Sequence, residues 1–144
     1  NCHPDMKGQL WCADISTSPD VGGPFESLIS TDLLEHIYLS DLEQTVQWML
    51  DNTKRFMFFL VAVTDGEEFI HTKGEVIPPK WEMTAISGHI HVRRWQWWAK
   101  FFKDKGLKIR WDLMYVFQLE REKHKEWRAT GGWDMPSTWV LEKV

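Results

Sequence analysis

The sequence of 144 residues has few cysteines and no long apolar run. Its two cysteines, Cys2 and Cys12, lack Cys-x-x-Cys spacing, which argues against a cysteine-based zinc site. A disulfide in an oxidising compartment and two free thiols in a reducing one both fit this pair. The longest apolar run, Phe56 to Val63, has eight residues and is much shorter than the ~20 that span a membrane.

The sequence also lacks the motifs of several enzyme classes. It contains no Gly-x-Ser-x-Gly elbow, no glycine-rich phosphate loop and no His-Glu-x-x-His helix. A Cys–His nucleophile pair of Cys12 and His89 stays open but has no specific support, so whether the chain is an enzyme is undecided at this stage. The N-terminus lacks the basic and apolar regions of a signal peptide, which slightly favours an intracellular protein over a processed one.

Tryptophan, by contrast, is abundant, with ten residues in a chain of otherwise ordinary globular composition. The length predicts a single domain spanning residues 1–144. Ten indoles exceed what one small core needs, which suggests that some of them face a ligand or a partner.

Charge is distributed unevenly along the chain. Residues 1–92 carry 5 Lys/Arg against 14 Asp/Glu, and residues 93–144 carry 12 against 7. A basic half on an acidic protein predicts either an anionic partner for that half or pairing between the halves, and the sequence leaves both open.

Hydrophobic periodicity predicts helices alternating with strands. Ser30 or Thr31 can cap a helix that carries Leu33, Leu34, Ile37 and Tyr38. Leu42, Val46 and Met49 then follow helical spacing after a capping box that begins at Ser40. Residues 55–64 form an uninterrupted apolar run typical of a central strand, and residues 94–105 predict a helix that Gly106 ends.

The second half contains the strongest strand pattern. Apolar residues occupy seven consecutive odd positions: Leu107, Ile109, Trp111, Leu113, Tyr115, Phe117 and Leu119. Further strands are expected at residues 9–15, 68–72, 81–92 with a bulge at 87–88, and 138–141, and a charged helix at 120–128. This order predicts an α+β fold, with a single antiparallel or mixed β-sheet packed by helices on one face.

One short motif suggests a metal site. In a strand, residues i and i+2 project from the same face, so His89 and His91 would direct both imidazoles toward one point. Two imidazoles can share one divalent cation, with Glu82 as a third ligand if a bulge corrects its parity. A hydrogen-bonded histidine pair without metal is the simpler alternative.

The segment from Glu82 through Gly88-His89-Ile90-His91-Val92, with the aromatic-basic helix and the strand at 109–111, resembles the HUH endonuclease domain of rolling-circle replication initiators. The resemblance covers about residues 80–130. It implies nicking of single-stranded DNA, with Mg²⁺ or Mn²⁺ held by His89, His91 and Glu82. Trp127 occupies the place of the family's nucleophilic tyrosine, which implies a divergent or nuclease-impaired member. Tyr115 is then the candidate nucleophile, with core packing as its alternative role.

The basic, aromatic segment predicts the surface that would bind single-stranded nucleic acid, because indoles stack on bases while cations hold phosphates. The predicted contact residues are Arg93, Arg94, Trp95, Trp97, Lys100, Lys108, Arg110 and Arg128. Two alternatives remain: a pocket for a lipid, sugar or aromatic ligand among the tryptophans, and a protein-interaction domain anchored by exposed indoles.

Overall fold

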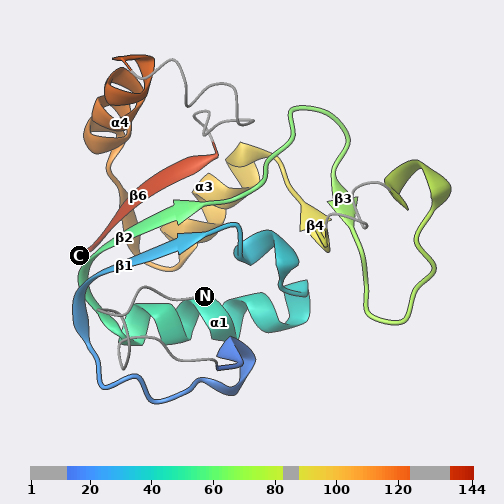
Figure 1. Cartoon of the computed structure of the whole chain (residues 1–144), viewed down its shortest axis with the longest axis horizontal. Helices are drawn as coiled ribbons and strands as arrows, with labels where there is room; N and C mark the ends of the chain where they lie inside the picture. The colour runs from blue at the N-terminus through green and yellow to red at the C-terminus, as the bar shows by residue number, and fades with distance from the viewer. Residues whose placement is uncertain (1–12, 83–87, 124–136) are drawn as a thin grey trace, which may run out of the picture.

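The computed structural model describes residues 13–82, 88–123 and 137–144, which form a mixed four-stranded sheet with flanking helices (Figure 1). In sheet order the strands are β1 (Phe25–Thr31), β2 (Thr53–Leu60), β6 (Thr138–Lys143) and β5 (Leu107–Ile109). A second sheet pairs β3 (Phe69–Ile70) with β4 (His91–Val92). The described helices are α1 (Leu39–Asp51), α3 (Trp95–Asp104) and α4 (Trp111–Lys123), so the predicted α+β class is confirmed.

The first half is a parallel strand–helix–strand unit. Strand β1 runs parallel to β2, with Ile29 opposite Phe58, and α1 connects the two strands. Helix α1 buries the apolar side chains that its periodicity predicted. The predicted capping box does not form: the helix begins at Leu39, and the Ser40 hydroxyl bonds to the Asp41 carboxylate within the first turn.

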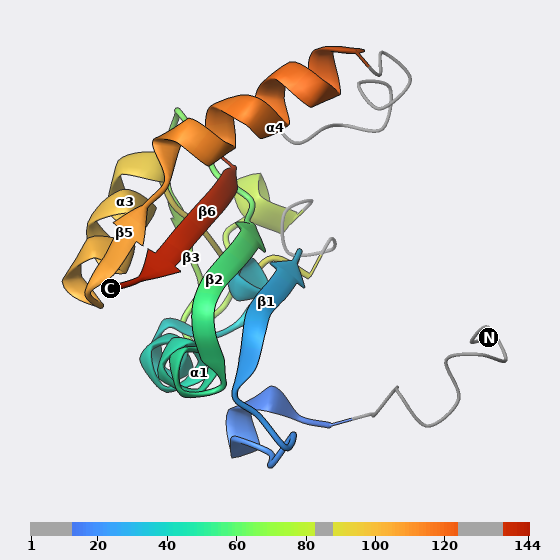
Figure 2. The ribbon, with the colours of Figure 1, turned by 90° about the vertical axis from the view of Figure 1, so that its left-hand side faces the viewer.

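The second half adds antiparallel strands and fills the core with aromatic rings. Strand β6 runs antiparallel to both β2 and β5. The rings of Phe59 and Trp139 both contact Phe102 of α3, with centroids 5.5 and 5.4 Å away. Phe58 projects from the opposite face of β2 and meets Phe117 of α4, 5.1 Å away. Helices α3 and α4 therefore reach opposite faces of the sheet (Figure 2).

The long strand predicted over residues 107–119 is wrong beyond Ile109. Strand β5 has three residues, and α4 starts at Trp111. The backbone N–H groups of Leu113 and Met114, in the first turn of α4, donate to the Arg110 carbonyl. Strand parity predicted Met114 exposed and Tyr115 buried, whereas Met114 is 1% exposed and Tyr115 is 58% exposed. Helical spacing, not alternation, decides which of these side chains is covered.

Other sequence boundaries also change. Of the strand expected over residues 81–92, His91–Val92 is the part that forms a strand within the described residues, and Trp81 instead ends the 3₁₀ helix η4 (Pro79–Trp81). Ser87 of the predicted bulge, Cys2, Cys12 and most of the 9–15 strand and 120–128 helix lie outside the described residues. Strand β1 was not predicted. In the described residues, no helix is both long and apolar enough to cross a membrane.

Candidate metal centre

Three side chains with metal-ligating atoms converge beyond the carboxyl end of β1. Glu35 and His36 belong to the short 3₁₀ helix η3 (Leu34–His36), which follows β1, and His89 lies just before β4. One ligand atom from each residue lies within 4.8 Å of the others. Ligand atoms around a bound divalent cation such as Zn²⁺ lie about 3.4 Å apart, so small side-chain rotations would bring these three atoms to that spacing. We call this group the Glu35–His36–His89 cluster.

Glu35 is fully buried, and its carboxylate is only half satisfied. The Ala62 N–H donates to Oε1 at 3.0 Å, whereas Oε2 has no hydrogen-bond partner among the described residues. The Glu35 main-chain carbonyl also accepts from the Ile90 N–H, which ties η3 to the segment that carries His89. A buried carboxylate oxygen without a partner is costly unless a cation or a proton donor meets it.

His36 is held in an orientation that suits metal binding. Its Nδ1 lies 2.7 Å from the Gly88 carbonyl, which can only accept, so Nδ1 carries the hydrogen and Nε2 keeps its lone pair. Metal-ligating histidines characteristically donate their second ring N–H in this way. Gly88 has φ +84°, and a Cβ there would lie 3.1 Å from His36 Nδ1, so this approach requires glycine.

His91, the second histidine of the motif, has a different position. Its ring is fully buried, and Nε2 donates to the Leu34 carbonyl at 3.0 Å. Burial lowers the pKa of His91 to about 4, so the imidazole is neutral at pH 7. His91 therefore anchors the backbone of η3 immediately before Glu35.

The structure thus brings together a different set from the one that the sequence proposed. Of the predicted ligands, only His89 belongs to the cluster, while His91 points to Leu34 and Glu82 is exposed after η4. Glu35 and His36 were missed because residues 31–38 were interpreted as an amphipathic helix. The adjacent Glu35 and His36, two residue types that ligate metals, were the signal that could have found them.

Most of the predicted nucleic-acid-binding cations already have intramolecular partners. Arg93 pairs with Glu68 at 3.1 Å and stacks on Trp97, while the Arg94 backbone N–H lowers the pKa of the same glutamate. Lys100 pairs with Asp104, and Arg110 pairs with Asp112 and Glu142. Lys108 is exposed on β5, and Arg128 lies outside the described residues, as does Trp127.

The remaining predicted residues are divided between the core and the surface. Trp95 and Trp97 are half-buried and pack against the core, with Trp97 stacked on Phe101. Tyr115 projects from α4, which lies well away from β4 in Figure 1. Because the Tyr115 side chain is exposed, core packing, the alternative weighed for it, is wrong.

A comparison with protein-family models, curated proteins and solved structures finds no match for this chain. The HUH resemblance therefore stays a prediction.

Proposed function

We propose that this chain binds a divalent cation at the Glu35–His36–His89 cluster and uses it to hold a phosphate of single-stranded nucleic acid. The observation that carries the proposal is the fully buried Glu35 carboxylate with an unpartnered Oε2 beside two imidazoles. A cation would supply the missing partner for this oxygen.

The donor set indicates the class of cation. Two imidazoles and one carboxylate suit first-row divalent ions such as Mn²⁺ or Zn²⁺ better than Mg²⁺, which prefers oxygen ligands. Three protein ligands leave coordination positions open for water or for a ligand oxygen, as in catalytic rather than structural metal sites.

The location of the cluster supports a ligand-binding role. In sheets with parallel strands, ligands bind beyond the carboxyl ends of those strands, and the cluster lies beyond that end of β1. The neighbouring β3–β4 pair is flanked by two cation–aromatic contacts, Arg93 over Trp97 and Lys80 over Trp81. Arg93 and Trp97 are already engaged by Glu68 and Phe101. The exposed Lys80 beside Trp81 is therefore the pair that could hold a phosphate and stack a base, which favours a nucleic acid as the anionic ligand.

Calorimetric titration with Mn²⁺ tests the metal site. We expect binding by the wild type and at least tenfold weaker binding by Glu35→Gln, His36→Ala and His89→Ala. The matched control is His71→Ala, which removes a histidine outside the cluster and should leave the affinity unchanged. Equal affinities for wild type and Glu35→Gln would disprove the site.

Titration of a labelled single-stranded oligonucleotide tests the ligand. Binding should strengthen when Mn²⁺ is added, weaken steeply with salt and lose its Mn²⁺ dependence in Glu35→Gln. An affinity that is the same with and without Mn²⁺ would remove nucleic acid from the proposal while leaving the calorimetric test of the cation untouched.

A further inference from the structure

We propose that the open edge of β1 is a docking site for an extended, basic β-strand of a partner protein. Among the described residues, β1 pairs only with β2, so the backbone groups along its other side are available for strand addition. This surface is separate from the Glu35–His36–His89 cluster and does not depend on it.

The two edges of the four-stranded sheet differ in how they are protected. Strand β5 has three residues, with exposed Lys108 at its centre, and short length and lysine both discourage strand addition. Strand β1 has seven residues, and its regular part, residues 27–31, contains no charge and no proline. Only β1 therefore presents an unprotected edge.

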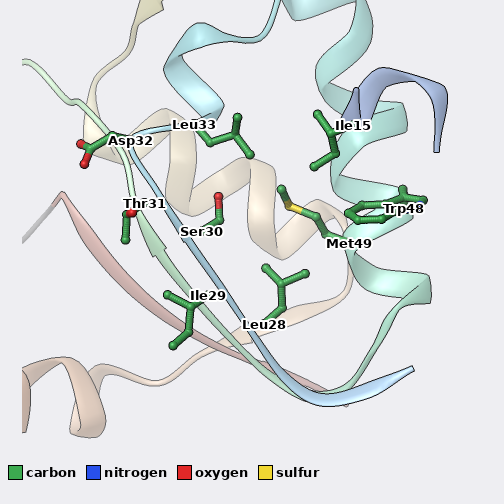
Figure 3. Close-up of a pocket in the computed structure, with 9 residues that line it drawn as sticks. All are labelled: Ile15, Leu28, Ile29, Ser30, Thr31, Asp32, Leu33, Trp48 and Met49. Carbon is green, nitrogen blue, oxygen red and sulfur yellow. The ribbon is translucent and has the colours of Figure 1, made fainter. Parts of the chain in front are cut away.

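Apolar surface lies on both sides of β1. Ile29 is 72% exposed on one side, although an edge strand of an isolated domain usually carries polar groups there. A cavity of about 470 Å³ runs along the strand, and Leu28, Ile15 and Trp48 line it together with Ile29 (Figure 3). An added strand with apolar side chains on both of its faces would cover Ile29 and fill part of this cavity.

Charge indicates the chemistry of the partner. Residues 13–51, which include β1 and α1, contain eight acidic residues and no lysine or arginine. Glu26 and Asp32, at the two ends of β1, are exposed and make no ion pair with another described residue. Lysine or arginine residues flanking the docked strand would meet these carboxylates.

A peptide probe tests the docking site on the full chain. The probe is a ten-residue peptide with a central run of valines and two lysines at each end, and its control has the same sequence with every backbone nitrogen methylated. We expect the unmethylated peptide to bind and to slow amide hydrogen exchange in residues 25–31. The methylated peptide, which cannot form the strand ladder, should bind at least tenfold more weakly.

Protein variants locate the binding edge. Ile29→Lys and, as a second variant, Ser27→Lys should each weaken peptide binding at least tenfold. Val76→Lys adds the same charge at a side chain that is 91% exposed elsewhere and should leave peptide binding unchanged. Equal binding of the methylated peptide, or an unchanged affinity in both β1 variants, would overturn the proposal. Slow exchange in the free protein of the β1 amides that face away from β2 would also overturn it, because the edge would then already be occupied by this chain or by a second copy.

Discussion

Glu35 determines how the candidate metal centre affects stability. Glu35→Gln keeps an oxygen that accepts from the Ala62 N–H but removes the buried negative charge. Without cation we expect the variant to equal or exceed wild-type stability by up to ~2 kcal/mol, because an unpaired buried charge is lost. With Mn²⁺ at a hundred times its dissociation constant, only the wild type should gain about 2.7 kcal/mol.

Urea unfolding with and without Mn²⁺ measures both effects. Glu35→Ala serves as the comparison, because it leaves the Ala62 N–H unpaired and should cost ~1–3 kcal/mol. An equal gain from Mn²⁺ in wild type and Glu35→Gln would show that the ion binds elsewhere.

Gly88 controls the position of His36. Alanine at residue 88 is strained at φ +84° and places its Cβ 3.1 Å from the imidazole. Gly74 is the control, because it has φ +90° and no atom within 4 Å of an added Cβ. Gly74→Ala therefore measures the cost of the positive φ alone, which we expect to be about 1 kcal/mol in both Gly74→Ala and Gly88→Ala. Gly88→Ala should cost more than Gly74→Ala and should also weaken Mn²⁺ binding, as urea unfolding and calorimetry would show. Identical behaviour of the two variants would mean that the His36 contact has no effect.

At the level of elements, α4 is the segment where local pattern and structure disagree. Its exposed apolar side chains surround most of the helix: Trp111, Tyr115, Val116, Phe117 and Leu119. Alternating apolar residues favour a strand, and β6 continues from Val140 back to Thr138 beyond its last residue paired with β5, yet β5 ends at Ile109. The chain turns at Arg110 instead, because its guanidinium bonds both Asp112 and Glu142.

Two neighbouring substitutions distinguish helix from strand over residues 111–119. In α4 Met114 is buried, so Met114→Ala should cost ~2–5 kcal/mol. Tyr115 is exposed, so Tyr115→Ala should change stability by at most about 0.5 kcal/mol. The free energies of urea unfolding check this order. A larger cost for Tyr115→Ala than for Met114→Ala would indicate a strand instead of a helix.

At the scale of the whole molecule, ion pairs connect the two halves of the chain. Arg93 pairs with Glu68, Lys105 with Glu43 and Arg55 with Glu142, and Glu142 also bonds Arg110 within the second half. Part of the uneven charge is thus neutralised by ion pairs within the protein. Pairing between the halves was one of the two interpretations of the sequence. A smaller part of the basic surface than the sequence suggested is available to nucleic acid.

Acid should weaken this network. The Arg110 side chain lowers the pKa of Asp112 from 3.8 to about 2 and lowers that of Glu142 as well. A lowered carboxyl pKa stabilises the fold above the ordinary value, and this contribution is lost as pH falls through the folded-state value. Asp112→Asn should therefore be less stable than wild type above about pH 4, and the difference should vanish toward pH 2.

Unfolding free energies measured between pH 2 and 6 test this dependence. Asp65→Asn, at an exposed position in the turn after β2, is the control for the loss of an aspartate that does not contact Arg110. A difference for Asp112→Asn that persists at pH 2 would contradict the assignment.

The sequence alone determined the elements whose burial repeats with a regular period. Helices α1 and α3 and strands β2 and β6 were predictable because each buries one apolar face or run, and Gly106, with φ +76°, ends α3 as expected. His89 was also recognised from sequence. Its partners were not, because they come from a turn more than fifty residues earlier in the chain.

Only the tertiary structure decided which side chains form the candidate site. The contact of His36 with Gly88 joins residues 52 positions apart, and Glu35 reaches Ala62 across 27 positions. Local propensity carries no information about such pairs, since they exist only after β1 and β2 align in parallel. For the same reason, His91 became a buried anchor of η3 while His89, two residues before it, joined the cluster.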